Sequence, residues 1–169
     1  MSRRTGKAAA VLVLALAACT GDRPDGSQEA AEQAPAQPAD AVTIETYADS
    51  LNVDLSKMER SSSGLYTQEV REGEGEPVQA GHRVAMAYTG WLPNGRRFDS
   101  SEGKQPYEFT VGRGEVIKGW DEGVIGMRIG GRRRIIVPPR LGYGDEGMGG
   151  VIPPSAVLVF DLELVTLAK

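Results

Sequence analysis

The chain has 169 residues, enough for one globular domain with appendages, since domains usually run to about 100–200 residues. It carries 19 Lys and Arg against 23 Asp and Glu, and residues 61–169 are nearly balanced, with 14 acidic and 13 basic side chains. The sequence therefore offers no large basic field, and its composition argues against a nucleic-acid partner.

The counts of cysteine and histidine exclude further classes of protein. Cys19 is the single cysteine and His82 the single histidine, so neither a disulfide framework nor a zinc cluster can form within one chain. A Ser–His–acid triad would have to use His82, which opens a strand-like segment, and a solvated strand edge is the ordinary setting for such a residue. We expect no metal and no cofactor.

The first nineteen residues have the pattern of an export signal. A basic start precedes an apolar run over residues 8–18, which is shorter than the about 20 residues that a membrane-spanning helix needs. The run ends in L-A-A-C at Cys19, which resembles the lipobox of bacterial lipoproteins, whose cysteine becomes acylated. We expect residues 1–18 to be a lipoprotein signal peptide and Cys19 to be the lipidation site. The alternative is a plain secretory signal in which Cys19 is incidental.

Residues 19–41 have the composition of a disordered tether. They are rich in Ala, Pro, Gln and acidic residues, and they lack the apolar surface that would offset the entropy of ordering. The likeness to lipoproteins implies an exported chain, anchored to a bacterial membrane by its N-terminal lipid and facing the periplasm. Thr20 does not match the aspartate linked to inner-membrane retention, which favours the outer membrane.

Residues 42–63 form a short extension before the main domain. Ile44, Tyr47 and Leu51 recur at helical spacing within residues 42–60, which predicts a short helix packed on the domain. The segment is too short for a long dimerisation helix, and we expect a monomer.

The domain begins at Gly64, and its first half predicts strands. GLYTQEV and HRVAMAYTGWL are strand-like, and in the second Val84, Met86 and Tyr88 share one face by alternation. Asn94-Gly95 then predicts a tight turn, and YEFTVG a further short strand.

The next segment changes period. Val116, Trp120, Val124 and Met127 recur at helical intervals and predict one short amphipathic helix within residues 115–127. Its glycines weaken it as an isolated helix but let it lie close to a sheet.

Two strands complete the predicted fold. GGRRRIIVPP predicts a strand in which Arg132 and Arg134 face away from Arg133, on a solvated sheet surface. AVLVFDLELVTLAK predicts a long half-buried strand, with leucines and Phe160 on one face. Many strands and one helix, without β-α-β alternation, indicate an α+β fold in which an antiparallel sheet curls over the helix.

The loop GYGDEG at 142–147 matches a G-x-G-x-x-G nucleotide pattern. A dinucleotide fingerprint requires a strand leading directly into the glycines and a helix starting from them. Prolines end the preceding strand, and MGGVIPP follows, which no helix interior would accept. The match is therefore incidental, and the loop is better suited to cover a ligand pocket.

Three stretches together resemble one known family. AYTGWLPNGRRFDSS at 87–101, VGRGEVIKGWDEGV at 111–124 and GYGDEGMGGVIPPSAVLVFDLEL at 142–164 are similar to the FKBP-type peptidyl-prolyl cis-trans isomerases. The likeness keeps the family's order and spacing over nearly all of residues 64–169. It implies an FKBP-like α+β fold, in which an antiparallel sheet of five or six strands wraps around one short helix, with an apolar pocket between them.

The resemblance also implies the roles of individual residues. Trp120 would be the floor on which a substrate proline rests, and Asp99 and the Tyr143 hydroxyl would be the catalytic groups that orient the substrate. The Ile117 N–H would donate to a ligand carbonyl. The implied substrate-binding residues are Tyr88, Phe98, Tyr107, Phe109, Val116, Ile117, Trp120, Val151, Ile152 and Phe160. Many members carry histidine and proline where this chain has Met148 and Gly149, a difference that bears on selectivity more than on activity.

The implied activity is isomerisation of X-Pro bonds in exported proteins. A non-catalytic peptide-binding or chaperone module using the same pocket is the alternative. The implied partners are proline-containing polypeptides, macrolide inhibitors of the family, and a membrane reached through the N-terminal lipid.

Overall fold

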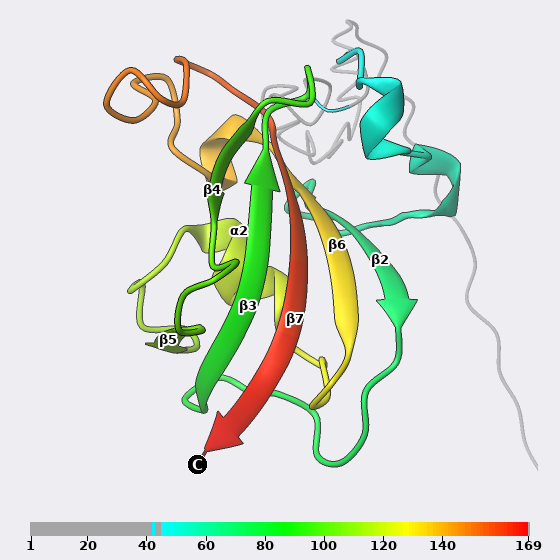
Figure 1. The fold of residues 1–169 in the computed structure, drawn as a ribbon, viewed down its shortest axis with the longest axis vertical. Coiled ribbons are helices and arrows are strands. Elements are labelled where there is room, and N and C mark those ends of the chain that lie inside the picture. The colour runs from blue at the N-terminus through cyan, green and yellow to red at the C-terminus, as the bar shows by residue number, and fades with distance from the viewer. Residues whose placement is uncertain (1–41, 43–44, 169) are drawn as a thin grey trace, which may run out of the picture. The chain divides into compact units, whose positions relative to one another are not determined.

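One antiparallel sheet dominates the fold (Figure 1). The computed structural model describes residues 42 and 45–168, and the predicted signal peptide, the Cys19 lipidation site and the tether lie outside them. The strands of the described residues are β1 (Glu59–Arg60), β2 (Tyr66–Arg71), β3 (Arg83–Trp91), β4 (Arg97–Ser100), β5 (Tyr107–Thr110), β6 (Arg132–Val137) and β7 (Leu158–Ala168). Their order is β1-β2-β6-β7-β3-β4, with β5 also paired to β3.

The predicted sheet wrapped around one short helix is confirmed, although the strand count differs from the five or six expected. The described residues form seven strands, three of which are short. β1 has only two residues, and β4 and β5 share one edge of the sheet, each pairing with a different half of β3.

The central strands β3 and β7 provide the core face as predicted. Leu158, Phe160, Leu162 and Leu164 of β7 alternate into the main core. The register between β3 and β7 shifts at Ala85 and Met86, and the unpaired residue, Val165, remains exposed. A bulge of this kind restores the alternation one residue later, so that Leu167 again packs on the core.

The helix α2 (Lys118–Gly123) is shorter than the sequence predicted, because Ile117 is its extended N-cap residue and Val124 already ends it. Its glycines do lie against the sheet. A Cβ on Gly119 would stand 2.6 Å from Val137 Cγ1, and one on Gly123 would stand 3.2 Å from Ile135 Cγ2. Gly119 therefore lets the helix backbone approach β6 more closely than a side chain would permit, whereas a Cβ at Gly123 would make only a tight contact.

The extension folds differently from the prediction. Instead of one amphipathic helix, its described part forms two 3-10 helices, η1 (Asp49–Leu51) and η2 (Leu55–Lys57). Leu51 is buried, and it belongs with Tyr66, Ile136 and Val159 to a second apolar cluster on the face of the sheet opposite α2. The extension therefore covers part of that face.

The prediction of a solvated arginine surface on β6 is wrong in part. Alternation does separate the side chains as expected, since Arg133 reaches the carbonyl oxygens of Gly123 and Ile125 beside α2. Arg134 points to the opposite face, where it makes a two-pronged ion pair with Asp161, at 2.6 and 2.8 Å, and donates to the Leu51 carbonyl oxygen. Only Arg132 remains largely exposed, because the extension and α2 cover the other two side chains.

Candidate functional site

A cavity of about 400 Å³ opens between α2 and the sheet, at the end where β4 and β5 divide. Its walls come from six separate segments of the chain, and most of the lining residues are apolar or aromatic. The residues that line it are Tyr88, Phe98, Asp99, Tyr107, Glu115, Val116, Ile117, Trp120, Tyr143, Met148 and Phe160.

Trp120 is at the centre of the aromatic wall. Its indole is 6 % exposed and stands edge-on to Tyr88 at 4.9 Å and to Phe160 at 5.4 Å between ring centroids. Tyr107 and Phe109 complete the ring of neighbours. Edge-on packing of this kind fixes the orientation of each ring. Trp120 is held on the first turn of α2, which the glycines set close to β6, so its face is positioned by the helix–sheet contact.

Hydrogen bonds to the Asp99 carboxylate mark the polar edge of the cavity. The Tyr88 hydroxyl donates to Asp99 Oδ2 at 2.6 Å, and the Ser100 N–H donates to Asp99 Oδ1 at 2.8 Å. Lys104 lies 3.9 Å from the same carboxylate. Burial, and next the hydrogen bond to Asp99, raise the pKa of the Tyr88 hydroxyl above its usual value. Tyr88 therefore remains a neutral donor through physiological pH.

Two further donors face the cavity. Burial and the nearby Asp99 charge raise the pKa of the Tyr143 hydroxyl, which keeps this group protonated as well. Tyr143 follows η3 (Pro139–Leu141), and its hydroxyl has no hydrogen-bond partner among the described residues. The Ile117 carbonyl accepts the first hydrogen bonds of α2, whereas its N–H is donated to no described residue. Both groups are thus free to bind a carbonyl oxygen placed in the cavity.

The glycine loop folds as a turn and not as the start of a helix. Gly147 has φ +69, and a Cβ there would lie 2.3 Å from the Ile152 carbonyl oxygen, so the backbone closes on itself at this glycine. Met148 and Ile152 then pair as an isolated bridge. This geometry lacks the strand-to-helix transition that a dinucleotide site uses.

The structure brings together nine of the twelve residues that the resemblance implied for catalysis and substrate binding. Phe109 is fully buried behind Tyr107 and Trp120, and Ile152 is a core residue with 2 % exposure. Val151 is 42 % exposed and does not line the cavity. Glu115, which was not expected, does line it, and its proximity to Val116 in the sequence was the available signal.

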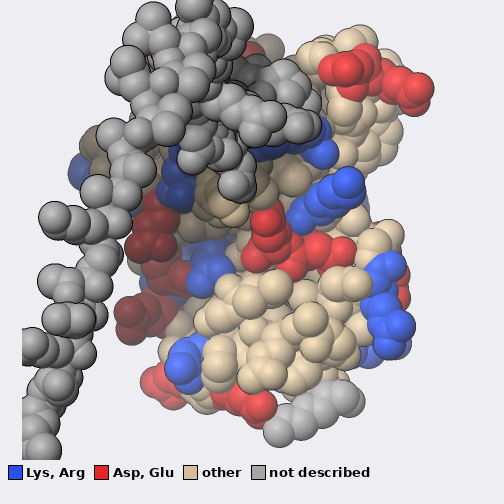
Figure 2. Space-filling view, turned by 180° about the vertical axis from the view of Figure 1, so that it is seen from behind, with Lys and Arg blue, Asp and Glu red and all other residues tan. Residues whose placement is uncertain are grey.

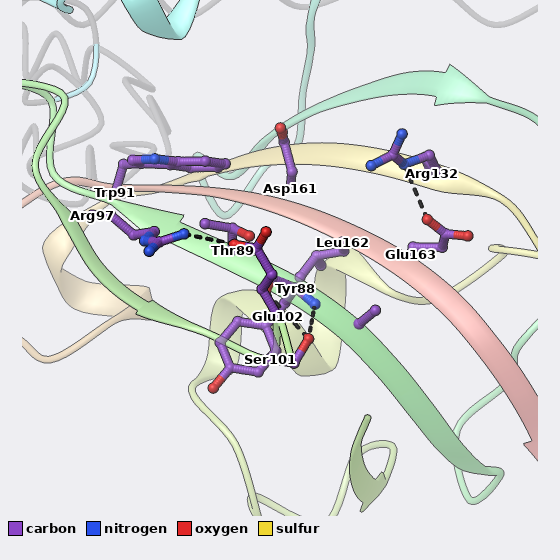
Figure 3. Close-up of a pocket in the computed structure, with 11 residues that line it drawn as sticks. Tyr88, Thr89, Trp91, Arg97, Ser101, Glu102, Arg132, Asp161, Leu162 and Glu163 are labelled. Atoms are coloured by element: carbon purple, nitrogen blue, oxygen red, sulfur yellow. Dashed lines mark hydrogen bonds and ion pairs between the residues drawn. The ribbon is translucent and has the colours of Figure 1, made fainter. Parts of the chain in front are cut away.

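A second hollow of similar volume lies on the opposite face of the sheet (Figure 3). The hollow is lined in part by Thr89, Trp91 and Asp161. Four further charged side chains in its lining form two ion pairs with one another. Arg97 contacts Glu102 at 2.8 Å, and Arg132 contacts Glu163 at 3.2 Å. Paired and solvated side chains of this kind form an ordinary sheet surface, so the aromatic cavity is the candidate site.

Charge is mixed on the helix side of the molecule. Figure 2 shows basic and acidic side chains interspersed around a broad uncharged area, and the described residues on this face form no continuous basic patch. Within the described part of the chain, no three His, Cys, Asp or Glu side chains are arranged to hold a metal ion, and no helix is long and apolar enough to cross a membrane.

Comparison with known proteins agrees with this geometry. Residues 74–165 match the sequence model of the family "FKBP-type peptidyl-prolyl cis-trans isomerase". The FK506-binding protein of Neisseria meningitidis serogroup B is 50% identical over 103 residues, which are 60% of this chain and 94% of the relative.

Solved structures show the same likeness. A peptidyl-prolyl cis-trans isomerase from Pseudomonas syringae pv. tomato has a TM-score of 0.61 and 34% identity, covering 67% of this chain and 82% of that chain. FkpA from Escherichia coli has a TM-score of 0.62 and 36% identity, covering 72% of this chain and 55% of that chain. The fold and the aromatic cavity define a prolyl isomerase domain. The chain belongs to the FKBP-type peptidyl-prolyl cis-trans isomerase family.

Proposed function

We propose that the aromatic cavity binds the proline of an X-Pro segment in exported polypeptides and twists the preceding peptide bond there, while the chain is anchored to a membrane through Cys19. The observation that carries the proposal is the enclosure of Trp120 by aromatic rings, with the Tyr88–Asp99 hydrogen bond at the edge. A compact apolar proline ring fits against an indole floor of this kind, and aromatic walls exclude water from the neighbouring amide.

The isomerisation depends more on the surroundings of the substrate amide than on reactive side chains. Amide resonance gives the C–N bond a rotation barrier of about 18–20 kcal/mol and places negative charge on the carbonyl oxygen. Water stabilises that charge in the planar ground state. An apolar cavity removes this stabilisation, whereas the twisted transition state has less charge separation to lose. Rotation breaks no covalent bond, so the proposal requires no nucleophile and no cofactor.

The polar groups at the edge would select the twisted geometry. The Tyr143 hydroxyl and the Ile117 N–H can donate to substrate carbonyl oxygens, and Asp99 holds Tyr88 in place by accepting its hydroxyl proton in a hydrogen bond. A donor that reaches the carbonyl only when the bond is twisted lowers the barrier, because it stabilises the transition state more than the ground state.

A peptide assay with the purified full chain tests this function. We expect the chain to accelerate X-Pro isomerisation in a short peptide, and Tyr143→Phe to lower kcat/KM by about threefold to tenfold, the loss that corresponds to one hydrogen bond. Tyr47→Phe is the matched control. Tyr47 lies on the other face of the sheet and donates to the Val42 carbonyl oxygen, so its loss should leave the rate unchanged. The proposal would be rejected if the peptide isomerised at the same rate with the wild-type protein as without protein.

Export and anchoring are supported by the sequence of the first nineteen residues. The expected result is membrane fractionation with a mass gain at Cys19, both lost in Cys19→Ser. A chain that fractionates as a soluble protein in both forms would contradict the anchor.

The comparison with the FK506-binding protein of Neisseria supports a macrolide as a further ligand of the same cavity, which competition in the peptide assay would reveal.

A chaperone function is the second candidate. Tyr107 and Met148 are 46 % and 42 % exposed at the mouth of the cavity, an apolar rim that could hold unfolded polypeptide without turnover. An Asp99→Ala, Phe98→Ala double variant separates the two functions. If aggregation of a client is suppressed as well by the variant as by the wild type while isomerisation is lost, binding is independent of catalysis.

A further inference from the structure

The tip of the glycine loop carries one wall of the cavity on a flexible backbone. Met148 lines the cavity, and the next two residues, Gly149 and Gly150, have φ values of +52 and +71. A short hydrogen-bonded turn closes the tip, since the Val151 and Ile152 N–H groups both donate to the Met148 carbonyl oxygen. Ile152 is buried and fixes one end of this turn. The position of Met148 therefore depends on how firmly the turn itself is held.

Arg96 reaches this turn from a different part of the chain. It follows the tight turn between β3 and β4, and its guanidinium Nη2 donates to the Val151 carbonyl oxygen at 2.5 Å, across 55 residues of sequence. Among the described residues, no carboxylate forms an ion pair with Arg96, whereas the adjacent Arg97 pairs with Glu102. The Val151 carbonyl is thus the partner that the structure gives to the Arg96 side chain.

The turn that carries Arg96 is itself well supported. The Gly95 N–H donates to the Leu92 carbonyl oxygen, and the Arg96 N–H donates to Asn94 Oδ1. The extension packs on the same turn, because the Ala48 N–H donates to the Pro93 carbonyl oxygen at 2.8 Å. Arg96 therefore projects from a hydrogen-bonded turn toward the tip that contains Gly149 and Gly150.

We infer that Arg96 is a positioning residue that holds the Met148–Val151 turn against the cavity and so sets the affinity for substrate. This inference rests on the proposed function of the cavity. A tip that is already ordered loses less conformational entropy when a peptide binds, so the contact lowers KM. Arg96 does not line the cavity, and the contact leaves kcat largely unchanged.

Kinetics of the purified full chain test the inference. We expect Arg96→Ala to raise KM by about threefold to tenfold, the range for one hydrogen bond, with kcat within about twofold of the wild type. Arg96→Lys retains a charged donor and should recover part of the loss. Arg97→Ala is the matched control, since this arginine lies beside Arg96 but contacts Glu102, and it should leave KM unchanged.

A double-mutant cycle decides whether the effect passes through Met148. If Arg96 acts by holding Met148, Arg96→Ala should change KM much less in a Met148→Ala background than in the wild type. An equal change in both backgrounds would overturn the inference, as would an unchanged KM in Arg96→Ala alone.

Hydrogen exchange gives a readout that does not depend on activity. Exchange of the Val151 and Ile152 amides should accelerate by about tenfold in Arg96→Ala relative to Arg97→Ala, because the turn opens more often without its anchor. Unchanged exchange would refute the positioning role whatever the kinetics show. A wild type without isomerase activity would instead reject the proposed function and leave the exchange experiment to judge the contact.

Discussion

The close approach of α2 to β6 can be tested by adding a single methyl group at Gly119. Carbon atoms in contact normally lie about 3.5–4.0 Å apart, but the new Cβ would stand 2.6 Å from Val137 Cγ1 and 2.9 Å from Cγ2. Val137 is fully buried on β6, so its methyl groups have no free space to enter. We expect the methyl group to push the helix away from the sheet.

The magnitude follows from two opposing effects. Alanine is favoured over glycine inside a helix by up to about 1 kcal/mol, whereas overpacking a buried site costs about 1–3 kcal/mol. Gly119→Ala should therefore destabilise the domain by about 0.5–2 kcal/mol. Gly123→Ala is the control on the same helix. Its nearest contact is the Ile135 Cγ2 methyl at 3.2 Å, a milder overlap, and the variant should be nearly neutral.

Val137→Ala supplies the second half of the test. Alone, it removes two buried methyl groups and should lower the free energy of unfolding by about 1.5–3 kcal/mol. In combination with Gly119→Ala it removes both of the atoms that clash, leaving only a Cβ at 3.3 Å. The double variant should therefore be more stable than the sum of the two single losses, by about 1–2 kcal/mol.

Urea denaturation followed by far-ultraviolet circular dichroism measures the free energy of unfolding of the wild type and the four variants. The peptide assay adds a functional readout, because Ile117 and Trp120 flank Gly119 and move with the helix. We expect kcat/KM to fall in Gly119→Ala and to recover in the double variant. A stabilising Gly119→Ala, or strict additivity with Val137→Ala, would show that the helix does not lie this close to β6.

Three further predictions concern other parts of the domain. Arg134→Ala should lower the free energy of unfolding by about 1.5–3 kcal/mol in urea melts, because its two-pronged ion pair and its contact with the extension are partly buried. The control is Arg132→Ala, since Arg132 lies on the same strand and face but its side chain is 54% exposed, and this variant should lower the free energy of unfolding by less than about 1 kcal/mol. Equal losses of stability in the two variants would argue against a special role of Arg134. Leu51→Ala should destabilise by about 2–4 kcal/mol if the extension is part of the folded unit, and a neutral result in the same melts would make it a mere linker. Because the pKa of Tyr88 is raised in the folded state, the unfolded chain loses the hydroxyl proton at lower pH than the folded chain. The contribution of Tyr88 to the free energy of unfolding should therefore be fully present below the unfolded pKa of 10.0 and should fall as the pH rises above it. Thermal melts from pH 8 to 11 should show a shallower fall in Tyr88→Phe, and parallel curves would contradict the assignment.

The direction of two site residues was predictable from local pattern, whereas the site as a whole was expected from the resemblance to the family. Trp120 recurs at helical intervals with Val124 and Met127, which predicts that it faces the core from a short helix, and the structure buries it there. Tyr88 was predictable from strand alternation, since it continues the face of Val84 and Met86. Where side-chain direction follows from a period of two or from a helix turn, the sequence is informative.

The rest of the site depends on backbone direction within irregular segments. Val151 and Ile152 are neighbours in one turn, yet Ile152 points into the core and Val151 toward solvent, because the chain reverses at the Met148–Ile152 bridge. No periodicity governs such a turn. The contact of Arg96 with Val151 joins segments 55 residues apart and leaves no local signature. The error at Arg134 has the same origin, since the extension that covers it lies more than 80 residues earlier.

The two faces of the sheet are therefore linked through one short turn. On one face the extension packs on the apolar cluster and donates from Ala48 to Pro93, which fixes the β3–β4 turn. From that turn, β4 carries Phe98 and Asp99 into the cavity on the other face, and Arg96 reaches the glycine tip. Loosening the packing of the extension on this face, as opposed to removing a hydrogen bond within the extension, should consequently alter substrate affinity although the extension touches no substrate. Leu51→Ala, assayed at a temperature where the domain remains folded, should raise KM in the same direction as Arg96→Ala, and an unchanged KM would mean that the turn keeps its place without the extension.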